Sequence, residues 1–318
     1  MKVFEKVNAK NSENDTGFGS NADNYGGRFI NKRGNANVKK SGINFMESIS
    51  WFHTLLTIPR WKFLLIVVLF YFIVNCIFAT LYYVIGVEHL RGIVGGSQID
   101  KFGQAFFFSV QTFTTVGYGH ISPNGFATSF VAAVEALIGL LSFAIATGLF
   151  YGRFSKPRAY LKFSANAIIA PYKNITALML RLSPFKNTNL SYAEAKITLG
   201  ITIEENGKKT NKFYPLLLEL NHVNTITLNW TLVHPIDKES PLFGISKSDF
   251  KKNEGEIMVF IKAFDDMFSA NVVKSHSYTF EQLVYGAKFL PMYFRNADNT
   301  KTILYLDKIN DFELVQLD

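Results

Sequence analysis

Two long apolar windows dominate the pattern of hydrophobic and polar positions along the chain. Residues 63–87 contain no Asp, Glu, Lys or Arg, and residues 126–152 contain a single acid, Glu135. About 20 consecutive apolar residues are enough for a helix to cross a bilayer. The pattern therefore predicts two membrane-spanning helices, which argues against a purely soluble enzyme and against a disordered chain.

Two shorter apolar segments accompany these windows. Residues 102–113 form an apolar run that is too short to span a membrane, so we expect a re-entrant helix. Residues 44–60 carry apolar side chains at helical spacing, with Trp51 and Trp61 suited to a membrane interface and Pro59 ending the helix. We predict a helix lying on the inner membrane surface, with a plain linker as the alternative.

The second half of the chain has a different pattern. Short apolar runs with polar breaks predict strands, and Asn206-Gly207 predicts a hairpin turn. The predicted strands are residues 175–182, 195–203, 214–220, 225–230, 257–264 and 288–294. Many short strands of this kind indicate a soluble β-sandwich. Near the amino terminus, residues 28–33 together with Asn37-Val38 predict a further short strand.

Charge sets the expected orientation in the membrane. The net charge is +8, and residues 1–62 hold ten Lys or Arg, whereas residues 88–125 hold Arg91 and Lys101 alone. The positive-inside rule then places both termini in the cytoplasm. Attraction to anionic lipid accounts for the basic excess, and we expect no nucleic-acid partner because no motif for one is present. The lone cysteine, Cys76, excludes an internal disulfide.

The segment Thr115-Val116-Gly117-Tyr118-Gly119, between the two windows, carries the chemistry. Potassium must lose its water to enter a narrow pore, and rings of backbone carbonyls from four chains can replace that water. The two glycines let alternate residues adopt backbone conformations that other residues avoid, so that all carbonyls can point to one axis. We therefore predict a potassium selectivity filter, with permeant K+ bound at Thr115 to Tyr118 and no other cofactor.

Three motifs in the correct order resemble the inward-rectifier potassium channel family, specifically its bacterial KirBac-type branch. Residues 106–119 are similar to the family's pore helix and filter, residues 146–159 to its inner-helix end and tether, and residues 229–244 to a signature of its cytoplasmic domain. The resemblance implies a homotetramer in a bacterial inner membrane. It also implies that a cytoplasmic immunoglobulin-like sandwich extends the ion path.

The predicted fold is thus a membrane α-helical pore, with two transmembrane helices and a re-entrant pore helix, followed by a cytoplasmic all-β immunoglobulin-like sandwich. The predicted parts are a flexible cytoplasmic amino terminus (1–43), an interfacial helix (44–60), a transmembrane pore domain (61–155), a linker (156–165) and a β-sandwich gating domain (166–318).

Gln111 and Glu135 are the predicted supports of the filter. The family usually has Glu where this chain has Gln111, so the support behind the filter must differ, because an amide forms hydrogen bonds but no ion pair. Glu135 is an acid within a membrane-spanning window, and such acids are functional candidates. We favour a bracing role for Glu135 over direct contact with the ion.

Four residues of the second window are candidates for the cavity and the gate. Phe143 stands where strongly rectifying relatives carry an acid, so the resemblance implies weak rectification. Tyr151 matches the family's inner constriction, where a ring of four aromatics can close and dewet the path; an interfacial anchor is the alternative. Gly139 and Gly148 permit either bending of the helix or close packing.

Basic residues gather at the predicted inner ends of the spanning helices. Such clusters bind anionic lipid headgroups, and the resemblance implies sensitivity to lipid, with phosphoinositides as candidates. Plain positive-inside topology is the alternative. The residues are Arg60, Lys62, Arg153, Lys156, Arg158 and Lys162.

The prediction is a lipid-regulated, potassium-selective channel of inward-rectifier type that closes at its inner helices. One alternative is a poorly selective cation channel, and another is a membrane-anchored β-sandwich that binds a partner without conducting. An enzyme is not expected, because no catalytic constellation stands out in the sequence.

Overall fold

The chain divides into two compact units. The computed structural model describes residues 16–18, 28–31, 34–42, 44, 50–186, 188–205 and 208–317. The helical unit is Ser41–Lys156, and the sandwich unit combines Met1–Lys40 with Pro157–Asp318.

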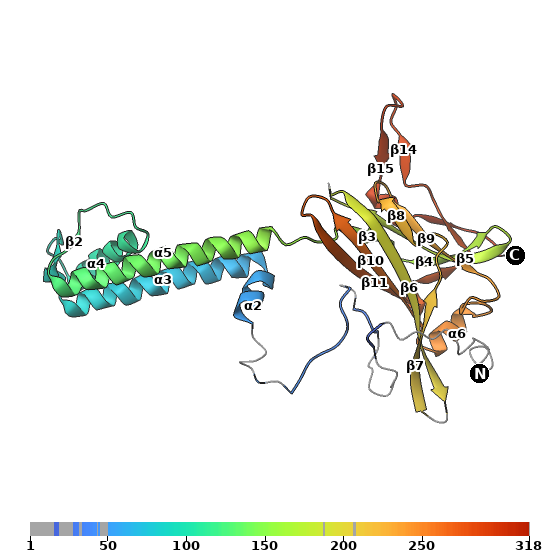
Figure 1. Cartoon of the computed structure of the whole chain (residues 1–318), viewed down its shortest axis with the longest axis horizontal. Helices are drawn as coiled ribbons and strands as arrows, with labels where there is room; N and C mark the ends of the chain where they lie inside the picture. Colours follow the sequence, from blue (N-terminus) through green and yellow to red (C-terminus); the bar gives the residue numbers. More distant parts are fainter. Residues whose placement is uncertain are drawn as a thin grey trace. The chain divides into compact units, whose positions relative to one another are not determined.

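The described part of the helical unit is built from four α-helices (Figure 1). They are α2 (Trp51–Thr57), α3 (Arg60–Ile85), α4 (Gln98–Phe113) and α5 (Phe126–Phe154), with a 3-10 turn η4 (Val87–His89) and paired strands β1 (Leu90–Arg91) and β2 (Ser122–Pro123) between them. Both α3 and α5 are long and apolar enough to cross a membrane, whereas α4 has 16 residues. The predicted pair of spanning helices with a shorter helix between them is confirmed.

One face of α3 packs into the helical unit. Four of its buried residues, Asn75, Phe78, Ala79 and Tyr82, follow the i, i+3, i+4, i+7 spacing of a single helical stripe, and Phe63 is buried near its start. Phe78 and Tyr82 pack in one cluster with Phe108 of α4. The remaining surface of α3 is largely exposed apolar side chain, as a helix in contact with lipid requires.

The start of α4 is specified locally. The Ser97 hydroxyl accepts from the Asp100 N–H at 3.3 Å, and the Asp100 carboxylate accepts from the Ser97 N–H at 3.0 Å, which forms a reciprocal capping box. After the end of α4 the chain returns to the segment that precedes this helix, because Arg91 of β1 pairs with Ser122 of β2. The segment between α4 and α5 is therefore held at both ends.

Two five-stranded sheets form the sandwich unit (Figure 1). The first contains β6 (Leu190–Glu205), β7 (Lys208–Leu216), β8 (His222–Thr225), β10 (Glu256–Asp265) and β11 (Ala270–Thr279), in the order β11-β10-β6-β7 with β8 also on β6. The second contains β3 (Leu161–Phe163), β4 (Ala167–Tyr172), β5 (Ile175–Pro184), β9 (Trp230–Ile236) and β12 (Leu283–Tyr285), in the order β12-β4-β5-β3 with β9 also on β5.

Smaller elements complete the sandwich unit. Two further antiparallel pairs join β13 (Ala287–Phe289) to β16 (Phe312–Leu314) and β14 (Tyr293–Arg295) to β15 (Thr302–Leu304). The short helices are α6 (Lys247–Lys252), η5 (Phe280–Gln282) and η6 (Leu306–Asn310).

The main core lies between the two large sheets. Leu178, Leu180 and Leu182 alternate along β5 and are fully buried, and Leu199 and Ile201 do the same on β6. Alternate residues of a strand share one face, so each sheet contributes one apolar face to this core. The predicted β-sandwich is confirmed.

The prediction of a strand at residues 225–230 is wrong. β8 ends at Thr225 and pairs with β6, whereas β9 begins at Trp230 and pairs with β5. The intervening residues cross from one sheet to the other. Ile226 and Trp230 are both buried in the core, so the apolar spacing that suggested one strand belongs to a crossover between two.

Some predictions fall on residues outside those described. These are the turn at Asn206-Gly207, residues 45–49 of the surface helix, and most of the amino-terminal 27 residues. The strands on either side of the turn, β6 and β7, pair antiparallel from Glu205 and Lys208 onward. The described part of the surface helix is α2, which ends before Pro59 as expected.

Residues near Phe29 belong to the sandwich unit, and a β-bridge joins Ile30 to Ala36. Phe29 is buried against Phe213 and Met258. The Glu256 carboxylate accepts from the Phe29 N–H at 2.6 Å and from the Ile30 N–H at 3.1 Å. This part of the amino-terminal segment is thus an added piece of the sandwich.

Candidate functional site: the Thr115–Gly119 segment and its supports

The backbone from Thr115 to Gly119 alternates in conformation. Thr115, Gly117 and Gly119 have positive φ angles of 59°, 54° and 78°, whereas Val116 and Tyr118 between them do not. Alternation of this kind turns successive carbonyl groups toward the same side of the chain. Glycine adopts positive φ without a steric penalty, which explains two of the three positions.

Thr115 is a non-glycine residue in the left-handed region, which costs about 1–2 kcal/mol. Hydrogen bonds at the end of α4 hold the backbone there: the Thr115 N–H donates to Thr112 O at 3.0 Å, and the Thr114 N–H donates to Val110 O at 3.1 Å. Strain of this size is found where the surrounding structure requires it, often at functional sites.

Gln111 contacts the Thr115–Gly119 segment through its backbone. Its carbonyl accepts from the N–H groups of Val116 at 2.9 Å and Gly117 at 3.3 Å. Its side chain has no hydrogen-bond partner among the described residues of the protomer. Support from Gln111 within one protomer therefore comes from its main chain.

The segment is open to its surroundings in a single protomer. Val116 is 53% exposed and Tyr118 is 79% exposed. Both side chains are apolar or aromatic and lie in the unit that spans the membrane. The protomer by itself leaves these side chains uncovered.

Glu135 lies at the centre of a buried polar network that joins three helices. Its carboxyl group accepts from the Tyr82 hydroxyl of α3 at 2.6 Å and is hydrogen-bonded to the Ser109 hydroxyl of α4. Ser109 also contacts Asn75 Oδ1 of α3 at 3.0 Å. All four residues are fully buried. Glu135 therefore connects α5 to the helix that precedes the filter segment.

Gly139 and Gly148 of α5 have different surroundings. A Cβ atom added at Gly139 would lie 2.0 Å from Phe113 O at the end of α4, whereas nothing lies within 4 Å of one added at Gly148. Gly139 thus permits a close backbone contact with α4. Gly148 has no such constraint within the described protomer.

Phe143 and Tyr151 project from α5 without being covered. Phe143 is 73% exposed and Tyr151 is 74% exposed. They are two helical turns apart, which places them toward the same side of α5. Neither side chain is covered by the rest of the described protomer.

The six basic residues predicted to bind lipid are divided between the two units. Arg60, Lys62, Arg153 and Lys156 are in the helical unit, and Arg158 and Lys162 are in the sandwich unit. Arg60, Lys62 and Lys156 are exposed, and so is Arg158. Lys162 is exposed too, although its ammonium donates to Leu306 O at 3.1 Å.

Unlike the other five, Arg153 binds backbone carbonyl groups at the end of α2. Its guanidinium donates to Leu55 O, and to Ile58 O at 2.7 Å, and it lies 4.4 Å from the centre of the Phe63 ring. The carbonyl groups at the end of a helix lack partners within the helix, and a basic side chain can satisfy them. Arg153 therefore caps the end of α2.

Sequence reasoning missed Asn75, Tyr82 and Ser109. A signal for two of them was available, because Asn75 is the lone amide in the first apolar window and Tyr82 follows it by seven residues on the same helical face. Their contact with Glu135 depends on how three helices pack, which spacing alone does not reveal.

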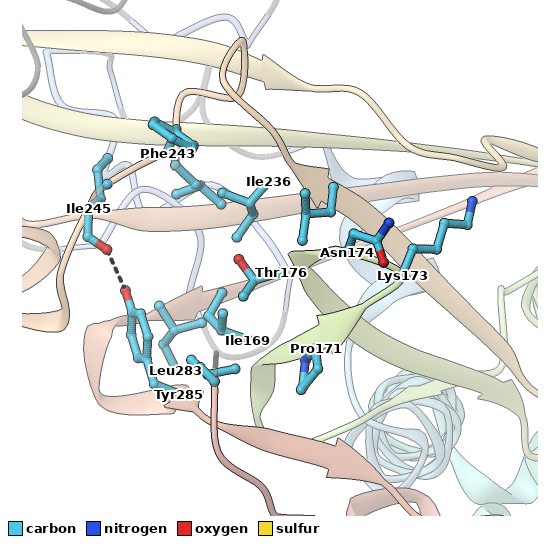
Figure 2. Close-up of a pocket in the computed structure, with 14 residues that line it drawn as sticks. Ile169, Pro171, Lys173, Asn174, Thr176, Ile236, Phe243, Ile245, Leu283 and Tyr285 are labelled. Atoms are coloured by element: carbon cyan, nitrogen blue, oxygen red, sulfur yellow. Dashed lines mark hydrogen bonds between the residues drawn. The ribbon is translucent and has the colours of Figure 1, made fainter.

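A pocket of about 470 Å³ opens in the sandwich unit beside the hairpin of β4 and β5 (Figure 2). Most of the residues that line it are apolar, and Ile169 is among those that point into it, but polar atoms also contribute to its surface. The Tyr285 hydroxyl donates to Ile245 O at 3.4 Å, and the Lys173 ammonium pairs with the Glu219 carboxylate at 2.7 Å. The pocket therefore combines apolar side chains with a cation that is already paired. Its residues belong to the sandwich unit, whereas Thr115–Gly119 belongs to the helical unit.

Two family models match the chain, one for each unit. The model described as "Ion channel" matches residues 63–156, and the model described as "Inward rectifier potassium channel C-terminal domain" matches residues 161–316. The chain belongs to the inward rectifier potassium channel family. The resemblance seen in the sequence motifs is therefore confirmed.

Relatives in this family cover most of the chain. It is 28% identical over 281 residues to the inward rectifier potassium channel Kirbac3.1 of Paramagnetospirillum magnetotacticum. This alignment covers 87% of this chain and 92% of that protein. It is 24% identical over 303 residues to inward rectifier potassium channel 18 of Homo sapiens, which spans 86% of this chain and 68% of that protein. Among solved structures, the sporulation control protein Spo0M from Bacillus subtilis aligns over 40% of this chain and 49% of that structure, with 8% identity. The TM-score of 0.22 is too low to indicate a shared fold.

The inward-rectifier signature at residues 229–244 is mainly structural in this chain. Trp230 and Leu242 are buried in the sandwich core. His234 is buried too, with Nδ1 at 2.6 Å from Leu217 O and Nε2 at 2.8 Å from Ser240 Oγ. Burial lowers the pKa of the His234 imidazole, against the opposing effect of the Leu217 carbonyl. The signature thus forms β9 and the turn that follows it, with His234 tying the strand to Leu217 and Ser240.

Proposed function

We propose that four copies of the chain assemble around Thr115–Gly119 and conduct potassium selectively through that segment. The alternating φ angles of this segment are the observation that carries the proposal. Carbonyl groups that point to one side can form stacked rings around a shared axis, and such rings replace the water lost by K+. The exposure of Val116 and Tyr118 supports the same assembly, since neighbouring copies would cover them.

Residues behind the segment hold it in place in this proposal. Glu135 braces α4 through Ser109, and Gln111 binds the first filter residues through its carbonyl. Gly139 lets α5 approach the end of α4. These contacts leave α4 little freedom to shift, which a filter requires, because carbonyl rings select ions only when their spacing is held.

Closure is assigned to the exposed aromatics of α5. Four Tyr151 side chains can narrow and dewet the inner end of the path, and Phe143 lines the cavity above them. Phe143 offers no charge to a blocking cation, so we expect weak rectification. Gly148 is the position at which α5 is free to bend.

Membrane lipid regulates the channel in this proposal. Anionic headgroups, with phosphoinositides as candidates, bind the exposed residues Arg60, Lys62, Lys156, Arg158 and Lys162. Arg153 contributes less, because its guanidinium is already used at the end of α2. The channel lies in a bacterial inner membrane with both termini in the cytoplasm, as the distribution of basic residues favours.

Flux through the purified full-length protein in liposomes tests this proposal. Potassium flux is measured against sodium flux, with barium as blocker and with Gly117→Ala as the filter variant. We expect potassium-selective, barium-sensitive flux that the variant loses, because alanine disfavours the positive φ at position 117.

Other results would point to the alternatives. Equal flux of sodium and potassium would leave a pore without selectivity. An absence of flux in every lipid, with and without phosphoinositide, and also in Tyr151→Ala, would favour a membrane-anchored binding protein.

A further inference from the structure

If the carboxyl group of Glu135 is ionised, the network around it has fewer hydrogen atoms than hydrogen-bond contacts. Ser109 Oγ lies within hydrogen-bond distance of both Glu135 Oε1 and Asn75 Oδ1, with 3.0 Å to the latter. A hydroxyl group has one hydrogen to donate, and both of these oxygens are acceptors when the carboxyl group is ionised. One of the two contacts would then contain no hydrogen.

The orientation of Asn75 is set by its own helix. Its Nδ2 donates to Tyr71 O at 2.7 Å. The opposite orientation of the amide would place Oδ1 against a carbonyl oxygen at the same short distance, with no hydrogen between them. Asn75 therefore presents Oδ1 to Ser109, and it needs the hydrogen of the Ser109 hydroxyl.

The second oxygen of Glu135 is already satisfied. The Tyr82 hydroxyl donates to Oε2 at 2.6 Å. The missing hydrogen thus belongs on Oε1, where it points to Ser109 Oγ. We propose that Glu135 is a neutral carboxylic acid and that it completes a one-way chain of hydrogen bonds that runs from Tyr82 through Ser109 and Asn75 to Tyr71 O.

The surroundings of Glu135 agree with this assignment. The residue is fully buried, and the ion pairs among the described residues lie elsewhere, in the sandwich unit. Tyr82 of α3 is the titratable side chain in contact with it, and α4 contributes the Ser109 hydroxyl. A buried charge without a partner costs several kcal/mol, and a neutral acid avoids that cost.

The inference gives Tyr82, Ser109 and Asn75 a role as positioning residues. Glu135, Ser109 and Asn75 each accept one hydrogen bond and donate one within this chain, so that α3, α4 and α5 are joined by directed hydrogen bonds. The positioning of the filter rests on the proposed function. The protonation of Glu135 does not, because it follows from the hydrogen count alone.

Infrared spectroscopy of the full-length protein in liposomes at pH 8 tests the inference without measuring conduction. A protonated carboxylic acid has a carbonyl stretching band that is separate from the bands of carboxylates. We expect this band in the wild-type protein and its loss in Glu135→Gln, which keeps one donor and one acceptor at the same place. Glu256→Gln, which alters a buried glutamate beside Arg28, is the matched control and should leave the band unchanged.

Tyr82→Phe gives a second measurement in a protein that retains Glu135. Loss of the donor to Oε2 should move the carbonyl band to higher frequency, because hydrogen bonding weakens the C=O bond. Absence of the band from the wild-type protein overturns the inference, and so does a band that persists in Glu135→Gln. If Glu135→Gln does not fold, an unmoved band in Tyr82→Phe overturns it. Failure of ion flux with the expected spectra would overturn the proposed function alone.

Discussion

The helical unit buries Glu135 and the sandwich unit buries Glu256, and the two glutamates are held by different kinds of partner. Glu256 accepts from the backbone N–H groups of Phe29 and Ile30, and Arg28 Nε lies 3.8 Å from its carboxylate. Among the residues that the structure describes, Glu135 is hydrogen-bonded by side-chain hydroxyl groups alone. The difference follows from the backbone. Residues inside a helix use their N–H groups within the helix, whereas an extended segment has N–H groups to offer.

The comparison predicts where charge can be buried in this molecule. In the sandwich unit, an added extended segment brings both backbone donors and a cation to Glu256. In the helical unit, three packed helices bring neither to Glu135. Free backbone groups occur in the helical unit at helix ends, and there Arg153 binds the carbonyls of Leu55 and Ile58.

The largest expected effect comes from removing the carboxylate of the sandwich unit. Glu256→Ala leaves the N–H groups of Phe29 and Ile30 without their acceptor and removes the ion-pair partner of Arg28, so we expect a loss of about 3 kcal/mol in the free energy of unfolding. Denaturant unfolding measures the loss, and limited proteolysis reports release of the segment near Phe29. Glu239→Ala, at an exposed position, is the control. Equal stability of the two variants would contradict the role given to Glu256.

Acid should destabilise the sandwich unit through a half-buried group, His276. Burial, with the positive charges of Arg28 and Lys274 adding to it, lowers the pKa of His276 to about 4. The ordinary value is about 6.5, so the unfolded chain takes up a proton in this range and the folded chain does not. The contribution of neutral His276 to the free energy of unfolding is therefore fully present above about pH 6.5. It is lost as the pH drops toward 4, by at most about 3 kcal/mol.

His276→Phe tests this dependence. Phenylalanine keeps a ring to stack on Phe163, whose ring centre lies 4.9 Å from that of His276. The variant should lose less stability than the wild-type protein between pH 6.5 and pH 4, in unfolding experiments at several pH values. His222→Gln, at an exposed position, should keep the wild-type slope. A slope that is unchanged in His276→Phe would rule out this residue as its source.

The helical unit should be sensitive to volume at its closest backbone contact. Gly139→Ala places a Cβ atom 2.0 Å from Phe113 O, so α5 and α4 must separate. Overpacking of this kind costs about 1–3 kcal/mol, and we expect lower thermal stability of the assembled protein together with reduced potassium flux. Gly148→Ala meets nothing within 4 Å among the described residues and is the matched control. Similar losses in both variants would show that the contact with α4 is not what matters.

The smallest effect concerns the helix end. Arg153→Gln removes the charge and shortens the reach to the carbonyls of Leu55 and Ile58, with an expected cost of about 1 kcal/mol. Binding to vesicles that contain anionic lipid should change less than in Lys156→Gln, because Lys156 is exposed. Thermal unfolding and vesicle binding separate the two tasks. A large loss of lipid binding in Arg153→Gln would assign this residue to lipid instead of to α2.

Some details of the site were readable in the sequence and others were not. The glycines at 117 and 119 predicted unusual backbone, and both have positive φ. Thr115 shares this conformation although its side chain disfavours it, because hydrogen bonds at the end of α4 impose it. Arg153 looked like a member of a lipid-binding cluster, and its contact with α2 depends on the packing of α2 against α5.

The sequence by itself determined the two spanning helices, the shorter helix between them, the unusual backbone at Gly117 and Gly119, and the β-sandwich. These features follow from local patterns of apolar residues, turn residues and glycines, since hydrophobic burial and backbone sterics act on neighbours in the chain. Only the tertiary structure decided which partners the buried polar groups have. Asn75, Ser109 and Glu135 are far apart in the chain, and their contact exists because three helices pack together while their backbone groups are already hydrogen-bonded within each helix.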